Sequence, residues 1–327
     1  MKALLNLVRW QNLLIVALTM ILMRYAVIEP LISKISIVFA GGAGDEIPLS
    51  LQFPWYDFLI LIAATIFITA GGYVINDYFD IKTDLINKGE VIVGTRIPRH
   101  QAMMWHNVLN VAGVAAGFYI SFKAGYFWMG VLFLIVSGLL YFYSASYKRQ
   151  FLVGNLIVAL LTAMVPMLVA VYEWPSLYRF YAANAETPPQ LGLIFYWVGG
   201  FAIFAFLTTL TREIIKDIED FEGDLAYGMN TLPVVAGPVT AKIVSISLIL
   251  VTVALLYTIW YFFLNDNITL IYISCAVVIP LLYIVYQLIT SVSKRQLHKA
   301  SRLMKVVMIS GVLYSLVVKV ILDHNLF

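Results

Sequence analysis

The sequence predicts an all-α membrane protein, built as one polytopic bundle of nine transmembrane helices. The composition, the length of the apolar segments and the distribution of positive charge support this prediction. Of 327 residues, 62% are hydrophobic and 12% are charged, and the mean hydropathy is +0.90. Soluble domains carry about 25% charged residues. No segment has a soluble composition, so residues 1–327 are expected to form a single integral-membrane domain.

Nine apolar segments are long enough to cross a bilayer, which takes about 20 residues in a helix. A β-barrel would show shorter, alternating segments, and lipid offers no partner for an open backbone, so the spans are predicted to be helical. Two longer loops are expected outside, at about 30–56 and 173–190. The predicted spans are 11–29, 57–76, 102–120, 125–143, 154–172, 191–211, 239–263, 268–290 and 304–322.

Positive charge predicts the orientation. Sixteen of the 21 Lys and Arg residues fall before the first span or in alternate connecting segments, the last of which is 294–305. Since cytoplasmic loops carry the excess of Lys and Arg, the N-terminus is predicted to be cytoplasmic and the C-terminus outside. Lys2 and Arg9 precede an apolar stretch with no small-residue cleavage signature, so the first span is interpreted as retained. The single cysteine, Cys275, has no partner for a disulfide.

Two acidic motifs share one spacing, D-x2-D-x3-D, 140 residues apart. Ten of the 18 acidic residues lie in the two segments 77–90 and 213–224. Each motif ends an apolar span, and the predicted orientation puts both on the cytoplasmic side. We expect Asn76, Asp80 and Asp84, spaced by four residues, to lie along one stripe of a helix, and the second motif's three aspartates likewise to share one face. The first motif comprises Asp77, Asp80 and Asp84, preceded by Asn76, and the second comprises Asp217, Asp220 and Asp224.

Carboxylates gathered in this way repel one another, the more strongly where water is scarce. A solvated helix end would account for one such motif, whereas two with matching spacing favour a cation between them. Ligands that are all oxygen, with no His or Cys, select hard cations, above all Mg²⁺. Because Mg²⁺ typically bridges one or two carboxylates to substrate phosphates, the motifs are predicted to bind two Mg²⁺ and a diphosphate. Among nearby basic residues, the candidates for contacts to the diphosphate are Lys148, Arg212 and Lys216.

A diphosphate site at a membrane surface suggests a lipid whose polar head is the leaving group. Metal ions there would act as Lewis acids on the departing diphosphate. The bundle interior would hold an isoprenoid tail, and some aromatic residues could stabilise an allylic cation.

With these motifs the chain resembles the UbiA-type intramembrane prenyltransferases over essentially its whole length. The first motif resembles the family's N-D-x-x-D-x-x-x-D, and the second its D-x-x-D-x-x-x-D. The resemblance implies that both motifs hold Mg²⁺ and the prenyl diphosphate, with Asn76 as a further ligand to metal and diphosphate. It implies catalytic roles for Asp80, Asp84, Asp220, Asp224 and Lys148. Two further matches are Arg9-x-x-Asn12, as diphosphate contacts, and the stretch from Tyr143-Ser144 to Lys148-Arg149 followed by Gly154-Asn155.

Within that family, residues 212–224 and the following Asn230-Thr231-Leu232-Pro233 most resemble digeranylgeranylglyceryl phosphate synthases. These enzymes attach a geranylgeranyl chain through an ether to geranylgeranylglyceryl phosphate. The resemblance therefore implies transfer from geranylgeranyl diphosphate to that acceptor. An aromatic quinone precursor or a chlorophyll-type acceptor is the alternative. The family often continues the first motif as N-R-P-x-R-P, whereas this chain has Asn87-Lys88-Gly89-Glu90-Val91-Ile92, and Arg96 or Arg99 could substitute for the missing arginine.

An interpretation from another class is a cation-coupled transporter, since acidic residues in membranes often mark ion paths. A transporter would favour isolated acids near mid-span and broken helices, whereas these acids cluster at span ends. A membrane scaffold with acidic loops is a second alternative. The expected partners are a prenyl diphosphate, a lipophilic acceptor and membrane lipids, with no nucleic acid and no obligate protein partner. The expected location is a cell membrane, as a multi-pass protein, if the source is prokaryotic.

Overall fold

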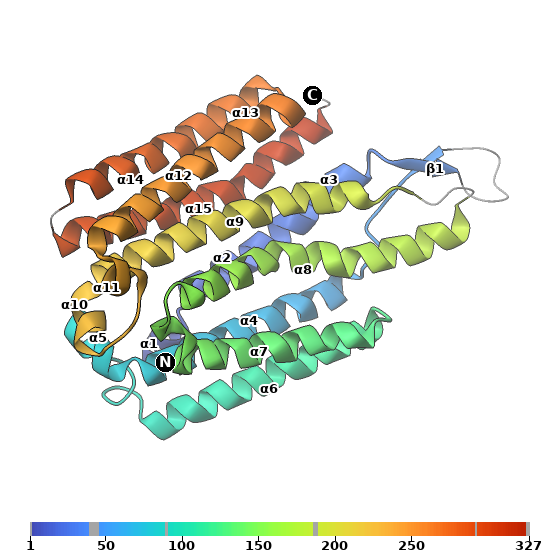
Figure 1. Ribbon diagram of the computed structural model, residues 1–327. Coiled ribbons are helices and arrows are strands. Elements are labelled where there is room, and N and C mark those ends of the chain that lie inside the picture. The colour runs from blue at the N-terminus through green and yellow to red at the C-terminus, as the bar shows by residue number, and fades with distance from the viewer. Residues whose placement is uncertain (1, 39–45, 89–90, 186–188, 292, 325–327) are drawn as a thin grey trace.

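The described residues form a bundle of long helices that run side by side (Figure 1). The computed structural model describes residues 2–38, 46–88, 91–185, 189–291 and 293–324. One short hairpin, β1 (Ser36–Val38) paired antiparallel with β2 (Glu46–Pro48), belongs to the predicted loop 30–56. The helices are α1 (Lys2–Leu7), α2 (Trp10–Leu22), η1 (Met23–Ile28), α3 (Glu29–Ile32), α4 (Trp55–Phe79), α5 (Ile81–Lys88), α6 (Arg99–Lys123), η2 (Phe127–Met129), α7 (Gly130–Ala145), η3 (Tyr147–Arg149), α8 (Val153–Asn184), α9 (Gly192–Glu219), α10 (Phe221–Ala226), α11 (Leu232–Ala236), α12 (Pro238–Ile259), η4 (Trp260–Leu264), α13 (Asn267–Tyr272), η5 (Ile273–Val278), α14 (Ile279–Thr290) and α15 (Lys294–Asp323).

Within the described residues, eight helices are long and apolar enough to cross a membrane. They match eight of the nine predicted spans. The remaining prediction, 102–120, falls within α6, a 25-residue helix that packs along α4 and α7 but carries more polar residues. The α1 end and the last turn of α15 lie at opposite ends of the bundle (Figure 1), as an odd number of crossings requires. The ninth crossing and the membrane side of each end stay predictions.

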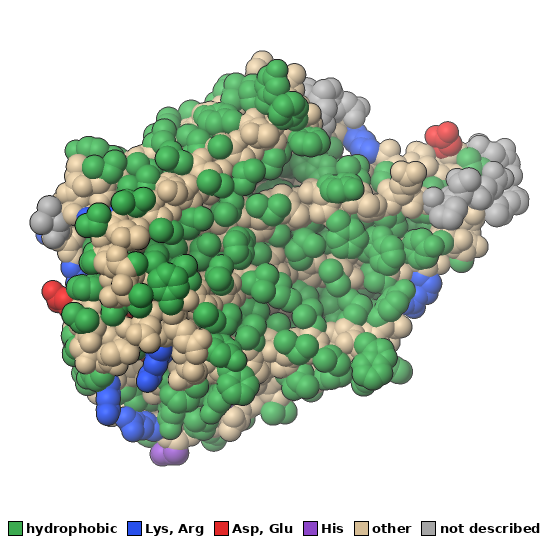
Figure 2. All heavy atoms as spheres, in the orientation of Figure 1, with side chains coloured by type: hydrophobic (Ala, Val, Ile, Leu, Met, Phe, Trp, Pro, Cys, Tyr) green, Lys and Arg blue, Asp and Glu red, His purple; other side chains and the backbone are tan. Residues whose placement is uncertain are grey.

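Apolar side chains cover the face of the bundle shown in Figure 2, and charged side chains gather towards its two ends. This distribution is the one a bilayer requires, because a charge in hydrocarbon is costly. The chain is thus an integral membrane protein.

Six helices form a closed ring: α2 contacts α4, α4 contacts α7, α7 contacts α8, α8 contacts α9, α9 contacts α15, and α15 contacts α2. Helix α6 packs outside this ring on α4 and α7, and α12 and α14 pack outside it on α9 and α15. The ring is important for function because its helices end, at one side, in both aspartate motifs.

Two of the spans contain a wide π-helical turn directly before a proline. Proline has no N–H, so the carbonyl four residues earlier loses its helical partner. Those carbonyls belong to Ala26, before Pro30, and to Ala276, before Pro280, and both lie inside the π turns. A local π turn changes the hydrogen-bond register and lets the helix continue past the proline.

A polar network fixes α4 against α6 and α7. His106 Nδ1 donates to the Gly71 carbonyl at 3.0 Å, and Ser137 Oγ donates to Asn110 Oδ1 at 2.6 Å. A Cβ on Gly71 would lie 2.3 Å from Asn110 Nδ2, so only glycine permits this approach. The network holds the helix that carries the first motif.

Helix α8 differs from the prediction of a loop over 173–190, because it continues to Asn184. The reason is a buried ion pair. Glu173 Oε2 lies 3.4 Å from Arg24 Nε, and these side chains are only 1% and 2% exposed. Glu173 Oε1 also accepts from the backbone N–H groups of Gln52 and Phe53, at 2.9 and 3.0 Å. Glu173 is thus neutralised inside the bundle and joins α8 to η1 and to the segment before α4.

We predict that Glu173→Gln destabilises the protein by about 3–5 kcal/mol, because it leaves Arg24 as an uncompensated buried charge. The amide oxygen of glutamine can still accept from the two backbone N–H groups, so the change in stability reports the loss of the negative charge. The double variant Arg24→Met/Glu173→Gln should recover part of the loss. Thermal and denaturant unfolding in detergent measure both.

Glu29→Gln removes an exposed carboxylate nearby and is the control, expected to change stability by less than about 0.5 kcal/mol. Equal stability of Glu173→Gln and the wild type would contradict the role of the pair.

Candidate active site

Both aspartate motifs adopt the same backbone conformation at the end of a long helix. Helix α4 ends at Phe79 and α5 begins at Ile81, so Asp80 lies at a break with φ −89° and ψ 1°. Asp220 lies at the equivalent break between α9 and α10, with φ −94° and ψ 8°. This sparsely populated region of φ and ψ often holds active-site residues. The expectation of one continuous helical stripe through each motif is therefore wrong at its middle aspartate.

Backbone hydrogen bonds also match across the two breaks. The N–H of Asp80 donates to Asn76 and that of Asp84 to Asp80, at 3.0 and 2.8 Å. In the second motif the N–H of Asp220 donates to Lys216 and that of Asp224 to Asp220, at 2.8 and 3.1 Å. The likeness between the motifs thus extends from spacing to local structure.

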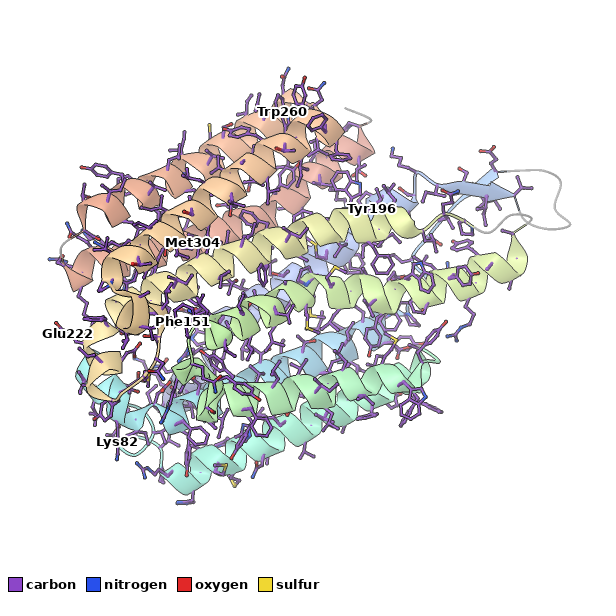
Figure 3. The ribbon with its side chains drawn as sticks, viewed as in Figure 1. Lys82, Phe151, Tyr196, Glu222, Trp260 and Met304 are labelled. Carbon is purple, nitrogen blue, oxygen red and sulfur yellow. The ribbon has the colours of Figure 1, made fainter. Side chains whose placement is uncertain are left out.

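The two motifs meet at one end of the bundle. Helices α5 and α10 are in contact, and the negative charge of Asp80 acts on Asp224. Figure 3 shows Lys82 on α5 and Glu222 on α10 at this end, and Tyr196 and Trp260 towards the other. Since carboxylates at such a range repel, each needs a compensating group.

Cationic groups from other segments compensate the first motif. Arg9 Nη2 donates to Asp77 Oδ1 at 2.8 Å, and Lys148 Nζ forms an ion pair with Asp80. Lys148 Nζ also lies 3.5 Å from Asn76 Oδ1. These contacts join the segment before α2, the end of α4 and the turn η3 between α7 and α8.

Neutral donors bind the second motif. Asn155 Nδ2 donates to Asp217 Oδ2 at 2.8 Å, and Thr231 Oγ1 donates to Asp224 Oδ2 at 3.1 Å. Burial raises the pKa of Asp224 to about 6, against the opposing effect of the Thr231 hydrogen bond, and Asp220 and Asp80 raise it further. Burial likewise lowers the pKa of Lys148, while Asp80 acts in the opposite direction. An added cation would relieve the repulsion among the second motif's carboxylates.

Three backbone features bring the chain into the site. Arg9 and Leu152 adopt left-handed backbone conformations, with φ of 53° and 57°, directly before α2 and α8. Such residues cost free energy unless the surrounding structure imposes them, and they concentrate at active sites. At Gly154 a Cβ would lie 2.6 Å from the Lys148 Cα, so glycine permits η3 to pack on the start of α8.

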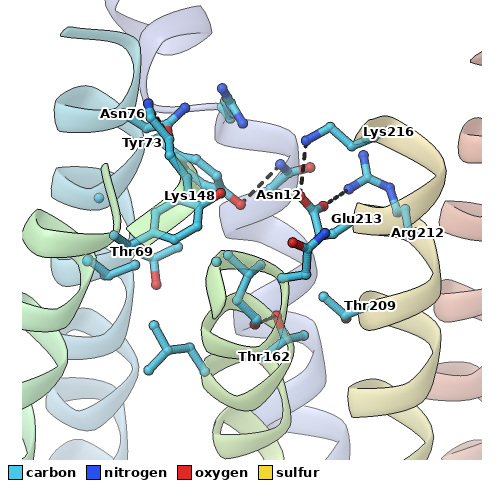
Figure 4. A pocket seen from close by; sticks show the side chains of 18 of the residues that line it. Asn12, Thr69, Tyr73, Asn76, Lys148, Thr162, Thr209, Arg212, Glu213 and Lys216 are labelled. Carbon is cyan, nitrogen blue, oxygen red and sulfur yellow. Dashed lines mark hydrogen bonds and ion pairs between the residues drawn. The ribbon is translucent and has the colours of Figure 1, made fainter. Parts of the chain in front are cut away.

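One cavity of about 700 Å³ brings the predicted site residues together. All twelve line it: Arg9, Asn12, Asn76, Asp77, Asp80, Asp84, Lys148, Arg212, Lys216, Asp217, Asp220 and Asp224. The close-up in Figure 4 shows Lys148 and the pair Arg212 and Lys216 on opposite sides of Asn12. In the sequence these residues belong to separate segments, whereas in the folded chain they surround one cavity.

The deeper part of the cavity is apolar. It extends along α4 from Asp80 as far as Thr65, which is roughly 20 Å at 1.5 Å per residue. Its walls come from five helices of the ring. The apolar lining includes Ile15, Val16, Ile68, Leu132, Phe133, Val136, Leu140, Leu161, Met164, Val165, Leu168, Met308 and Ile309. A space with charged groups at one end and a long apolar wall suits an amphiphile with an anionic head.

The charge of the cavity favours entry of a metal together with an anion. Seven carboxylates and five cationic groups line it, which gives a formal charge of −2. An anion alone would be repelled by the six motif aspartates. No three acidic or histidine side chains of the described residues converge into a ready-made metal site. This donor set fits Mg²⁺, which commonly takes one or two carboxylates and completes its shell with water and substrate phosphate oxygens.

Sequence reasoning missed two charged cavity residues, Glu213 and Lys305. Glu213 accepts from Arg212 Nη1 at 2.7 Å and from Lys216 Nζ at 3.1 Å, and it lies one helical turn before Asp217. The spacing of four residues between Glu213 and Asp217 is the sequence feature that could have placed Glu213 in the site. Lys305 was assigned to a cytoplasmic segment because its charge agreed with the orientation rule, yet α15 begins at Lys294 and includes it.

The segment after the first motif contributes through Val91 and Ile92, which line the cavity. Residues 89–90 lie outside the described residues, and neither Arg96 nor Arg99 is among the residues that line it. The predicted substitution of one of these arginines for a missing phosphate contact stays a prediction.

Comparison with known proteins identifies relatives of this chain. The model of the UbiA prenyltransferase family matches residues 47–309. A protein from Methanobrevibacter smithii named digeranylgeranylglyceryl phosphate synthase is 35% identical over 223 residues, which cover 68% of this chain and 73% of that protein.

Solved structures share the fold. A structure described as a digeranylgeranylglyceryl phosphate synthase superposes with a TM-score of 0.62 at 23% identity, covering 96% of this chain and 98% of the other. A UbiA homologue from Archaeoglobus fulgidus, bound to DMAPP and Mg²⁺, superposes with a TM-score of 0.53 at 18% identity, covering 96% and 99%.

We predict that Gly154→Ala destabilises the protein by about 1–3 kcal/mol, because the new methyl group would collide with backbone atoms of Lys148. The collision would also move Lys148 away from Asp80. The matched control is Gly138→Ala on α7, where no atom lies within 4 Å of an added Cβ. Unfolding in detergent measures both, and equal effects of the two changes would contradict the packing argument.

Proposed function

This chain belongs to the UbiA prenyltransferase family, and we propose that it transfers a geranylgeranyl group from geranylgeranyl diphosphate to the hydroxyl of geranylgeranylglyceryl phosphate, forming an ether lipid. The observation that carries the proposal is the single cavity. Both aspartate motifs line one end of it, and apolar side chains from five helices line the rest. The name of the relative from Methanobrevibacter smithii supports the choice of donor and acceptor.

The metal is proposed to be Mg²⁺, with two ions bound by the six motif aspartates and Asn76. The structure of the homologue with DMAPP and Mg²⁺ supports this proposal, as does the oxygen-only donor set. Mg²⁺ would neutralise the charge that develops on the departing diphosphate.

The chain's own residues would orient the donor. Lys148 lies against Asp80 and Asn76 and can reach a diphosphate oxygen at the first motif. Arg9 lies over the Tyr73 ring at 4.8 Å while it binds Asp77, so its guanidinium is fixed from two sides. The apolar walls would exclude water from the tail and from the reacting carbon. That exclusion favours capture by the acceptor over hydrolysis.

The bond changes balance as a substitution. The bond between C1 of the prenyl group and the diphosphate oxygen breaks, and both electrons leave with the diphosphate. The acceptor hydroxyl oxygen forms the new bond to C1, and its proton passes to the diphosphate or to water. Tyr73 and Tyr143 are the tyrosines that line the cavity, and their rings can stabilise positive charge on the allylic carbon.

The transporter interpretation predicted isolated acids near mid-span. Six of the seven cavity carboxylates belong instead to the two motifs at one end of the ring, and the chain belongs to an enzyme family. Prenyl transfer therefore replaces transport as the proposed function.

We predict that Asp80→Asn and Asp220→Asn each lower kcat/KM for prenyl transfer by more than about a hundredfold, as loss of one preorganised electrostatic group does in other active sites. Purified protein with radiolabelled geranylgeranyl diphosphate measures product lipid with Mg²⁺ and with EDTA. Asp323→Asn, at the far end of α15, is the control and should retain full turnover. Unchanged turnover in both motif variants would exclude the two-motif mechanism.

Mass spectrometry of the product lipids tests the acceptor. We expect geranylgeranylglyceryl phosphate to be prenylated in preference to aromatic acceptors when a panel is offered at equal concentrations. Prenylation of an aromatic acceptor alone would contradict the proposed acceptor while leaving the transfer reaction intact.

A further inference from the structure

Lys305 is a cation inside the bundle that the proposed mechanism does not use. It is the twelfth residue of α15, within a helix long and apolar enough to span the membrane, and it is half-buried. Its Nζ donates to Asn12 Oδ1 at 2.6 Å. Among the described carboxylates, none forms an ion pair with it. Lys305 is the last of five cationic residues in the first twelve of α15, so it lies where the polar first turns of the helix meet its apolar remainder.

Lys305 lines two hollows that have several lining residues in common. It lines the main cavity and also a smaller one of about 290 Å³ beside Asn6, Arg9, Trp10, Gln11 and Asn12. The charges of Arg212 and Arg9 act on it, which places it within electrostatic reach of Arg212 on α9. An ammonium group here can contact a ligand that enters the main cavity.

Arg212 and Lys216 share one carboxylate, Glu213, and their side chains remain 28% and 36% exposed. The Arg212 Nε is buried and has no hydrogen-bond partner among the described residues. With Lys305 these two residues form what we term the basic cluster. The three positive charges of the basic cluster and the negative charge of Glu213 give a formal charge of +2.

Two groups of side chains in the cavity carry opposite net charge, and Lys216 lies within electrostatic reach of both, since its charge acts on Asp217 and Asp224. The six motif aspartates with Arg9 and Lys148 carry a formal charge of −4, whereas the basic cluster with Glu213 carries +2. Figure 4 shows part of both groups, with Asn12 between Lys148 on one side and Arg212, Glu213 and Lys216 on the other. A diphosphate can approach the negative side with metal ions, and a second anion without a metal is attracted to the positive side.

We propose that Arg212, Lys216 and Lys305 bind the phosphate monoester of the acceptor lipid, at a subsite separate from the metal and diphosphate. This inference rests on the proposed function, in which the acceptor carries such a phosphate. Arginine can bind two phosphate oxygens at once and lysine acts as a point charge, so the cluster can hold a dianionic phosphate. With its phosphate there, the acceptor places its hydroxyl towards the aspartate motifs, where the prenyl cation forms.

Lys305→Met tests the subsite because it removes the charge while it keeps a long apolar side chain. We expect KM for geranylgeranylglyceryl phosphate to rise about tenfold to a hundredfold, as for loss of a charge-assisted hydrogen bond. KM for geranylgeranyl diphosphate should stay within about twofold of the wild type. The kcat/KM preference for the phosphorylated acceptor over dephosphorylated geranylgeranylglycerol should shrink by the same factor. Lys305→Arg should restore most of the preference.

The matched control is Lys299→Met, which removes an exposed charge from the same helix outside the cavity and should leave both KM values unchanged. A rise in the KM of the diphosphate rather than of the acceptor would assign Lys305 to the donor and overturn the proposal. An unchanged preference for the phosphorylated acceptor in Lys305→Met would overturn it as well.

A binding measurement separates this inference from the proposed function. Without Mg²⁺, geranylgeranylglyceryl phosphate should raise the thermal midpoint of the wild type and should not raise that of Lys305→Met. Phosphatidylglycerol, a phosphodiester, should stabilise neither. If stabilisation depends on Lys305 but the wild type transfers no prenyl group, the proposed function is contradicted and the phosphate subsite is supported. Equal stabilisation of both proteins, or equal stabilisation by phosphatidylglycerol, would remove the subsite.

Discussion

The placement of six aspartates at one end of a membrane bundle is the constraint on which the rest of the structure depends. Each carboxylate in a poorly hydrated space repels the others, so the fold must supply compensating groups. Four side-chain contacts do so: Arg9 to Asp77, Lys148 to Asp80, Asn155 to Asp217 and Thr231 to Asp224. The first three join segments 62 to 68 residues apart in the sequence. The same contacts therefore compensate the charge of the aspartates and hold the helices of the ring together.

The difference between the partners of the two motifs has a chemical consequence. Cations bind the first motif, while neutral donors bind Asp217 and Asp224 in the second. Asp217 and Asp224 thus have no directly bound cation in the described structure, and burial, followed by the charges of Asp220 and Asp80, raises the pKa of Asp224. A metal ion bound at the first motif would compete with Lys148 for Asp80, and Lys148 would then turn towards a phosphate. Lys148 can then bind the anion that arrives with the metal.

Eight of the nine predicted spans match helices long and apolar enough to cross a membrane, and the predicted site residues line one cavity, because both patterns depend on local composition. A 20-residue apolar run needs no tertiary context, and ten acidic residues in two segments of a membrane chain require a common reason. Features that depend on contacts between helices could not be predicted. Helix α8 continues through Glu173 only because Arg24 neutralises it, and the motif helices break at Asp80 and Asp220 where the two motifs face each other. Lys305 was explained by the excess of positive charge in cytoplasmic segments, so the sequence offered no reason to place it on the cavity wall.

A transferase with two anionic lipid substrates must keep their heads apart while it brings the reacting atoms together. Metal ions at the aspartates can bind a diphosphate, but the same aspartates would repel an acceptor phosphate that lacks a metal. The chain places its uncompensated positive charge across Asn12 from Lys148, on α9 and α15. Both heads can then be bound at one end of the ring, and both tails can enter apolar surroundings. Under the proposed function this arrangement serves both substrates, since a uniformly acidic cavity would repel the acceptor phosphate and a uniformly basic one would not bind the metal ions.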